Sequence, residues 1–236
     1  MNCTLRLFAV VGLVVSAALP IRASLINGSF EAPTVGAKSI LYSLEIPGWK
    51  TTDTKFEIWS SGARYLWDAF DGNQYAELNY LQAATLYQEV AGIAAGQRVG
   101  FQFAHRARPA KDDTAAERAT DRVDTMNFTL TDLGANGLFG DGDDTVLFTK
   151  NYSDHTTAWG FYTAANEAPI ITLGHTVRFA YTAVDSAAPS YGNFLDAADF
   201  GVGVGGVPTP DGGTTVAMLA AALASLSALR RKFACG

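Results

Sequence analysis

The side chains best suited to bind a ligand gather in an aromatic-rich segment, residues 59–73. Tryptophan and tyrosine rings can stack on the apolar C–H faces of sugars, while carboxylates, amides and arginine hydrogen-bond to sugar hydroxyls. Gly62 and Gly72 would let such a loop turn sharply. Arg106, farther along the chain, lies on the polar side of an alternating run and could reach the same ligand. The candidate sugar-binding residues are Trp59, Tyr65, Trp67, Asp71, Asn73 and Arg106.

The same residues also fit simpler roles. Sandwich cores often bury tryptophan, because its large ring system removes much apolar surface from water. A core position is therefore open for Trp49, Trp59 and Trp67. Arg106 and its neighbour Arg108 could instead form surface ion pairs with Asp112 or Asp113.

Signals for catalysis or a metal centre are weaker. The sequence has no Gly-x-Ser-x-Gly elbow and no glycine-rich phosphate loop. Glycoside cleavage needs only two carboxylates close in space, so Glu57, Glu77 and Glu89 stay open for that role. The run 140–144 is rich in aspartate but lacks the downstream glutamate of a calcium loop, which favours a hairpin turn. The three histidines, which lack metal-ligand spacing, are His105, His155 and His175.

Short alternating runs must position these residues. Residues 24–206 show no sustained 3.6-residue period; apolar and polar side chains alternate in segments cut by Gly, Asn, Asp and Pro, which is typical of an antiparallel sandwich or barrel. His105 ends one run on its apolar side, so we expect a partly buried, hydrogen-bonded histidine there. We predict an all-β fold, an antiparallel β-sandwich. Its strongest predicted strands span 98–105, 126–131 and 177–183, and the weaker ones 56–60, 74–79, 85–90, 145–150, 160–164 and 193–204.

One segment, residues 112–122, breaks the alternating pattern. It is polar and rich in alanine, and Thr114 with Glu117 fits a capping box at the start of a helix. A helix this short is marginal without packing. The segment is therefore either a single short helix or a mobile loop.

The two ends of the chain differ from the middle. Residues 1–23 combine an early positive charge, an apolar helical core and a small-residue cleavage site, as in a secretory signal peptide. Residues 207–236 contain an apolar run of sixteen residues, 214–229, which as a helix would rise roughly 24 Å. This is slightly short of the ~30 Å hydrocarbon core, a deficit that snorkelling basic side chains can make up. We predict a C-terminal transmembrane helix with its basic end in the cytoplasm, and one domain, 24–206, between the two ends.

The C-terminal tail resembles the bacterial PEP-CTERM sorting signal, in its variant that reads Val-Pro-Asp-Gly-Gly. The matching residues are Pro210, Asp211, Gly212 and Gly213, followed by the apolar run and the basic residues Arg230 and Arg231. The resemblance implies that an exosortase-type processing enzyme recognises the tail in the inner membrane and removes it. It also implies export to the cell envelope or beyond, in a Gram-negative bacterium that forms extracellular polysaccharide.

The middle of the chain resembles the galactose-binding-like jelly roll, a fold that many carbohydrate-binding modules share. The motifs that carry this resemblance are residues 27–31, 47–49, 56–59, 71–79, 86–90 and 199–202. In such jelly rolls the first and last strands are neighbours, which implies that Glu31 and Asp199 meet. The resemblance further implies that a structural Ca²⁺ joins them there with backbone carbonyls. The alternative is that Glu31 only hydrogen-bonds to nearby backbone N–H groups.

Charge and cysteine content limit what the domain can do. Residues 24–210 hold 12 Lys and Arg against 22 Asp and Glu, a net charge of −10. Such an acidic body argues against nucleic acid or anionic lipid as a partner. Both cysteines, Cys3 and Cys235, lie in the terminal segments, which excludes thiol chemistry and Cys-ligated zinc from the domain. We expect an exported, non-catalytic module that binds extracellular polysaccharide; the alternatives are a structural matrix or adhesion protein and a secreted glycosidase.

Overall fold

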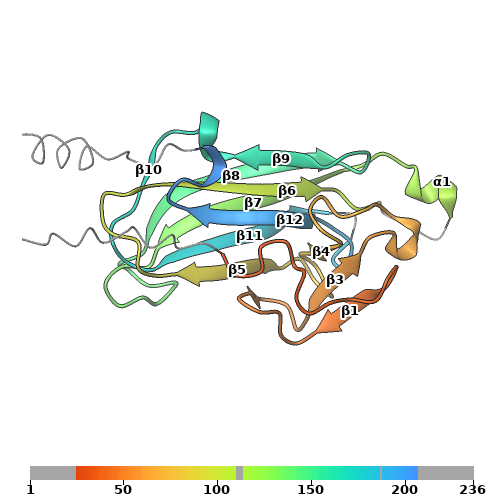
Figure 1. Ribbon diagram of the computed structural model, residues 1–236, viewed down its shortest axis with the longest axis horizontal. Coiled ribbons are helices and arrows are strands. Elements are labelled where there is room, and N and C mark those ends of the chain that lie inside the picture. The colour runs from red at the N-terminus through yellow and green to blue at the C-terminus, as the bar shows by residue number, and fades with distance from the viewer. Residues whose placement is uncertain (1–24, 110–113, 187, 207–236) are drawn as a thin grey trace, which may run out of the picture.

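The computed structural model describes residues 25–109, 114–186 and 188–206, and these form two antiparallel sheets packed face to face (Figure 1). One sheet has the order β1-β3-β4-β12-β6-β10, with β9 also paired to β6, and the other the order β2-β5-β11-β7-β8. The strands of the first, seven-stranded sheet are β1 (Ile40–Ser43), β3 (Phe56–Ser60), β4 (Gln74–Glu77), β6 (Arg98–Arg106), β9 (Gly160–Thr163), β10 (Ile170–Ile171) and β12 (Phe194–Gly201). Those of the second, five-stranded sheet are β2 (Lys50–Thr51), β5 (Thr85–Val90), β7 (Val123–Asp132), β8 (Thr145–His155) and β11 (Val177–Asp185).

The order of the strands is that of a jelly roll. Strands β4, β5, β6 and β7 alternate between the two sheets, and β8, β9, β11 and β12 return beside them. As a result β12 lies between β4 and β6, and β11 lies between β5 and β7. This nesting is two Greek keys wound together. It confirms the predicted antiparallel β-sandwich and its jelly-roll topology.

Most predicted strands are confirmed, with differences at their ends. The runs 56–60 and 85–90 match β3 and β5, whereas β8 continues past residue 150 to His155. Strands β1, β2 and β10 are not predicted, because they are short and carry no clear alternation. The segment 112–122 contains one helical turn, α1 (Ala115–Arg118), which projects at one end of the molecule (Figure 1). Both bonds of the expected capping box between Thr114 and Glu117 are present.

A core rich in phenylalanine fills the space between the sheets. Phe101 and Phe103 of β6 meet Phe128 of β7 and Tyr181 of β11, and all four side chains are fully buried. The ring centroids of Phe101 and Phe128 lie 4.6 Å apart, and those of Phe103 and Tyr181 lie 5.1 Å apart. Such aromatic pairs contribute about 0.5–1.5 kcal/mol beyond the burial of their area. Because side chains alternate along a strand, this core also fixes which residues of β7 and β11 face outward.

A second, smaller core lies on the outer side of the seven-stranded sheet. Trp59 of β3, Tyr75 of β4 and Phe194 of β12 are fully buried there under the segment 61–70. The ring centroid of Phe194 lies 5.4 Å from that of Trp59 and 5.0 Å from that of Tyr75. The aromatic-rich segment therefore packs on this sheet as a cover. It is not a free loop.

The predicted signal peptide and sorting signal, residues 1–23 and 207–236, lie outside the described residues. Within the ranges that the structure does describe, no helix is both long enough and apolar enough to cross a membrane.

Candidate functional site

The aromatic residues predicted to contact a ligand lie largely in the two cores. Trp59 is fully buried, and Trp49 is 4% exposed and stacks on Phe30 at a centroid distance of 4.9 Å. Trp67 is half-buried, with the guanidinium carbon of Arg106 only 3.7 Å from its ring centroid. The side chain of Tyr65 is outside the described part of the chain. The core interpretation therefore holds for Trp49 and Trp59, and Trp67 keeps a partly exposed ring.

Asp71 and Asn73 lie at the other end of the aromatic-rich segment, beside the start of the domain. Ser29 Oγ donates a hydrogen bond to Asp71 Oδ2 at 2.6 Å. The backbone N–H of Asn73 donates to Glu31 Oε1 at 2.7 Å. The predicted ligand residues thus fall into two groups, one around Trp67 and the other around Asp71.

Glu31 and Asp199 make separate sets of backbone hydrogen bonds. Glu31 Oε1 accepts from Gln74 N–H at 2.8 Å as well as from Asn73, while Asp199 Oδ1 accepts from Phe200 N–H at 2.8 Å. This is the hydrogen-bonded alternative for Glu31. Among the described residues, no group of three or more His, Cys, Asp and Glu side chains is arranged to hold a metal ion. The calcium site stays a prediction.

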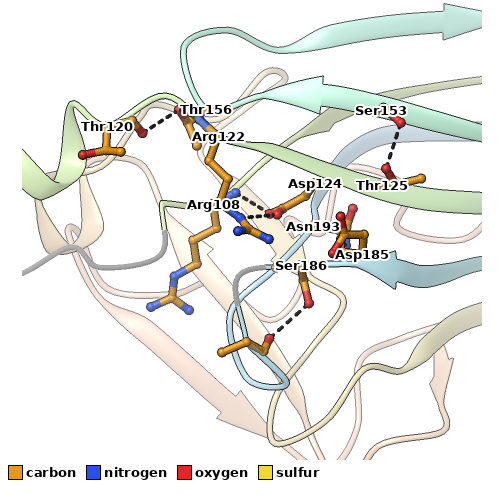
Figure 2. A network of polar contacts seen from close by, with 12 residues as sticks. Arg108, Thr120, Arg122, Asp124, Thr125, Ser153, Thr156, Asp185, Ser186 and Asn193 are labelled. Atoms are coloured by element: carbon orange, nitrogen blue, oxygen red, sulfur yellow. Dashed lines mark hydrogen bonds and ion pairs between the residues drawn. The ribbon is translucent and has the colours of Figure 1, made fainter.

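The two arginines of β6 and its extension are buried, and each is held by a specific acceptor. Arg106, 5% exposed, donates from Nε and Nη2 to the carbonyl oxygen of Thr156, at 2.9 and 2.6 Å. Arg108, 3% exposed, donates to both carboxylate oxygens of Glu77 and, through its backbone N–H, to Asp124. Figure 2 shows Arg122 at the same Asp124 carboxylate, where Arg122 Nε donates to Oδ1 and the Arg108 N–H donates to Oδ2. Asp112 and Asp113, the surface partners considered for these arginines, lie outside the described residues.

His105 belongs to the same end of the sandwich. Its side chain is fully buried, with Nδ1 bonded to Asp154 at 2.7 Å and Nε2 bonded to Asn193 at 2.8 Å. The expectation of a hydrogen-bonded histidine is confirmed, and its burial is complete where only partial burial is expected. Both ring nitrogens have protein partners, and the side chain is closed off from solvent.

Three acidic side chains on the outer side of the seven-stranded sheet are buried and hold their protons more tightly than usual. Glu57 and Glu77 are direct partners across β3 and β4. Burial raises the pKa of both, and the proximity of Glu77 raises the pKa of Glu57 further. Burial also raises the pKa of Asp196 to about 8, against the effect of hydrogen bonds from the backbone of Asp71, Ala197 and Phe70. At 5% and 1% exposure, the side chains of Glu57 and Glu77 are buried.

The outer side of the five-stranded sheet carries a continuous set of polar side chains, which we call the polar face. In β7, Met126, Phe128 and Leu130 are buried in the core, so the residues between them point outward. Three outward residues of β7 hydrogen-bond to their partners in β8: Thr125 with Ser153 at 2.8 Å, Asn127 with Asn151 at 2.8 Å and Thr129 with Thr149 at 2.9 Å. The polar face consists of Thr85, Tyr87 and Glu89 on β5, Arg178 and Thr182 on β11, Thr125, Asn127 and Thr129 on β7, and Thr149, Asn151 and Ser153 on β8.

Arg178 is held between two aromatic rings on this face. Its guanidinium carbon lies 3.5 Å from the ring centroid of Tyr87 and 3.8 Å from that of Phe139. Phe139 comes from the loop that joins β7 to β8 and is 55% exposed. Glu89 lies beside the stack, 3.9 Å from Arg178 and in an ion pair of 2.6 Å with Lys50. An exposed aromatic ring, a planar cation and rows of hydroxyl and amide groups therefore share one surface.

Sequence patterns alone do not identify this face. Alternation predicts that Asn127, Thr129 and Arg178 point outward, but it does not say which strands are neighbours. Tyr87 and Phe139 come from segments far from Arg178 in the sequence, and only the pairing of β5 with β11 and the path of the loop after β7 bring them together. The run 140–144 is confirmed as part of that hairpin loop, which joins β7 to β8.

The fold and the polar face together define a jelly-roll β-sandwich with an outer surface suited to a hydroxyl-rich ligand. Threonine hydroxyls both donate and accept hydrogen bonds, and asparagine amides do the same with fixed geometry. Aromatic rings add an apolar surface that can stack on the C–H groups of a sugar.

No protein-family model matches the chain, and no curated protein matches it in sequence. Among solved structures, the chain is similar to TmCBM61 in complex with β-1,4-galactotriose, with 15% identity and a TM-score of 0.44 over 76% of this chain and 97% of that chain. The CBM22-2 xylan-binding domain from Paenibacillus barcinonensis shares 14% identity, with a TM-score of 0.42 over 70% of this chain and 99% of that chain. The C-terminal family 22 carbohydrate binding module of Clostridium thermocellum Xyn10B shares 11% identity, with a TM-score of 0.41 over 71% and 95%.

Proposed function

We propose that residues 24–206 form a non-catalytic glycan-binding module, with a polysaccharide lying across the polar face. The observation that carries the proposal is the stack of Tyr87, Arg178 and Phe139 beside hydrogen-bonded rows of threonine, asparagine and serine. Phe139 is 55% exposed, so part of its ring is open to a ligand on this face. A sugar chain would use that ring for stacking and the rows for its hydroxyls.

The geometry of the sheet favours a polymer over a small ligand. Neighbouring strands lie about 4.8 Å apart, so the four strands of the polar face span roughly 15 Å. A polysaccharide can lie across such an open surface without entering a deep pocket. Each sugar unit then makes only a few hydrogen bonds. Affinity for one chain should therefore be modest, and many copies on one polysaccharide would raise it through avidity.

Export is part of the same proposal. A secretory signal in residues 1–23 and a sorting signal in residues 207–236 would carry the module through the inner membrane to the envelope or the extracellular matrix, with an exosortase-type enzyme removing the tail. The intact mass of the protein recovered from its native host tests both cleavages at once. A mass that still includes the residues beyond Gly213 would refute processing.

Binding is tested by affinity electrophoresis and calorimetry with a panel of neutral and acidic polysaccharides. We expect Phe139→Ala and Tyr87→Ala each to weaken binding at least tenfold, about 1.4 kcal/mol. Tyr42→Ala is the matched control, since Tyr42 is 48% exposed on β1 of the opposite sheet. If all three variants bind with equal affinity, the polar face is not the binding site.

The outcome also separates the other candidate functions. A folded protein that binds no polysaccharide in the panel would instead fit a structural matrix or adhesion protein with protein partners. Release of new reducing ends from any polysaccharide would identify a glycosidase and refute the non-catalytic assignment.

A further inference from the structure

Strand β8 forms a long edge of the five-stranded sheet. It spans eleven residues, and in the described part of the chain it pairs only with β7. The other strands with a single neighbour, β1, β2, β9 and β10, have two to four residues each. Sandwich proteins keep exposed edges short, because the free N–H and C=O groups of an edge strand can pair with another chain. β8 departs from this pattern.

The edge of β8 is accessible. A groove of about 410 Å³ lies beside it, lined by four consecutive residues of β8, 150–153, and by residues 161–163 of β9 in the other sheet. Side chains of consecutive strand residues point to opposite sides, so a space that touches all four follows the backbone edge. Tyr152 is the only buried residue of β8. A further strand can therefore approach β8 from this side.

The sequence of β8 does little to prevent such pairing. Edge strands are commonly protected by proline, by free charges or by a bulge. β8 has no proline, and the one shift in its register with β7 falls within its first four residues, which leaves 148–155 regular. Its lysine and its aspartate balance each other and both have partners, Lys150 with Glu167 at 2.6 Å and Asp154 with His105 at 2.7 Å. In an otherwise acidic domain, this strand does not repel a copy of itself.

The outward side of β8 is complementary to a second β8. In an antiparallel pair centred on Asn151, Asn151 lies opposite Asn151 of the second copy, and Thr149 lies opposite Ser153. These are the kinds of pairs that already join β8 to β7, where Asn127 bonds to Asn151 and Thr125 bonds to Ser153, both at 2.8 Å. The hydrogen-bonded rows of the polar face would therefore continue from one copy into the next.

The inward side of β8 tolerates the same register. Lys150 then lies opposite Tyr152 of the second copy, and Asp154 lies opposite Phe148. Lys150 Nζ already lies 5.3 Å from the ring centroid of Tyr152 in its own strand, so the second copy offers it a contact of the same kind. Like charges directly opposite each other would destabilise a strand pair, and this register contains none.

We propose that β8 is a self-association edge, through which two copies of this chain pair in antiparallel register about Asn151 and join two five-stranded sheets into one. The two-fold axis is then perpendicular to the sheet, so both polar faces lie on the same side. A pair of strands buries less area than a standard interface, and the dimer should be weak, with a Kd on the order of 10–100 μM. The pairing itself does not depend on a ligand. Its consequence, avidity for one polysaccharide, rests on the proposed function.

The test is sedimentation velocity of the full chain from about 1 to about 500 μM, in a mild detergent that keeps the apolar ends in solution. The unsubstituted protein should dimerise over this range. Asn151→Asp and Asn151→Lys each place like charges at the two-fold axis and should weaken the dimer at least tenfold, whereas an equimolar mixture of the two variants should restore it. Leu44→Asp adds the same charge at a residue that is 72% exposed outside β8, and this control should leave the dimer unchanged.

The charge exchange also separates β8 from the chain ends. Association through the ends would be the same in every variant, because residue 151 does not touch it. The proposal is wrong if the unsubstituted protein stays monomeric, if the Asn151 variants dimerise as strongly as it does, or if mixing them restores nothing. Urea unfolding midpoints show that each variant is folded. Polysaccharide binding is measured separately, so a protein that dimerises without binding glycan refutes only the proposed function.

Discussion

Replacing Glu77 with glutamine removes the carboxylate that neutralises Arg108 inside the protein. Arg108 Nη1 donates to the two oxygens of Glu77 at 3.0 and 2.8 Å, and its guanidinium carbon lies 4.7 Å from the Trp59 ring centroid and 4.0 Å from that of Tyr191. Arg108 is 3% exposed and Glu77 is 1% exposed. Removing one partner of a buried ion pair costs about 3–5 kcal/mol, because the remaining charge stays out of water. We expect Glu77→Gln to lower the free energy of unfolding by about 3 kcal/mol, near the lower end of this range.

The lower value follows from Glu57, the cross-strand partner of Glu77. Burial and the charge of Glu77 raise the pKa of Glu57, so Glu57 is neutral near neutral pH. Arg108 acts in the opposite direction and lowers that pKa. Once Glu77 is neutral, Glu57 can ionise and supply part of the missing charge. We therefore expect the double variant Glu57→Gln/Glu77→Gln to lose more free energy of unfolding than the two single variants lose together. The extra loss should be about 1–3 kcal/mol.

Urea unfolding at pH ~8 measures these differences, because burial raises the pKa of Glu77 to about 7 and that of Glu57 to about 9, so that Glu77 is ionised and Glu57 is neutral there; the m value is checked for each variant. Glu57→Gln alone completes the double-mutant cycle. Glu77→Gln/Arg108→Met removes both charges of the pair and should recover much of the lost stability, since an apolar replacement of a buried pair is often neutral. The reasoning is refuted if Glu77→Gln costs less than about 1 kcal/mol, or if the effects of Glu57→Gln and Glu77→Gln add within about 0.5 kcal/mol.

Two further predictions concern Asp196 and calcium. The pKa of Asp196 is about 8 in the folded protein, above the ordinary value of 3.8. The stability that Asp196 contributes is therefore fully present below pH 3.8 and is lost as the pH rises toward 8. Asp196→Asn should therefore flatten the fall of the free energy of unfolding between pH ~5 and ~8, by at most about 1.4 kcal/mol per pH unit. Urea unfolding at several pH values measures this slope, and an unchanged slope would show that Asp196 titrates normally. If Ca²⁺ joins Glu31 and Asp199, a chelator should lower the melting temperature by several degrees, and a variant with Asp199→Asn should lose that response. An unchanged melt together with no calcium in elemental analysis would contradict the site.

Local alternation predicts a large part of the sandwich because burial acts on each strand directly. Phe101 and Phe103, and likewise Phe128 and Leu130, are spaced two apart and are all buried in the main core. The same rule predicts that Asn127 and Thr129 point outward. It gives no guidance for β1, β2 and β10, whose few residues take their conformation from the strands they pair with.

Sequence patterns do not predict which of the candidate site residues are exposed, because the burial of an aromatic side chain depends on the segment that covers it. Trp59 and Trp67 lie in a segment that looks like a ligand loop, yet that segment packs on Phe194, a residue more than a hundred positions away. Two arginines so close in sequence suggest surface ion pairs, yet Arg106 donates to the Thr156 carbonyl and Arg108 donates to the Glu77 carboxylate, both inside the protein. No local pattern carries information about such distant partners.

By itself the sequence determined the class of fold, most of the strands, which side chains of each strand share a side, and the absence of cysteine between the two terminal segments. These properties follow from side-chain periodicity and composition, which are local. Tertiary structure alone decided that Tyr87, Arg178 and Phe139 form one stack, and that Arg108 meets the Glu77 carboxylate inside the protein. The physical reason is that a binding surface on a jelly roll is built across strands, and the order of those strands is set by the packing of two whole sheets.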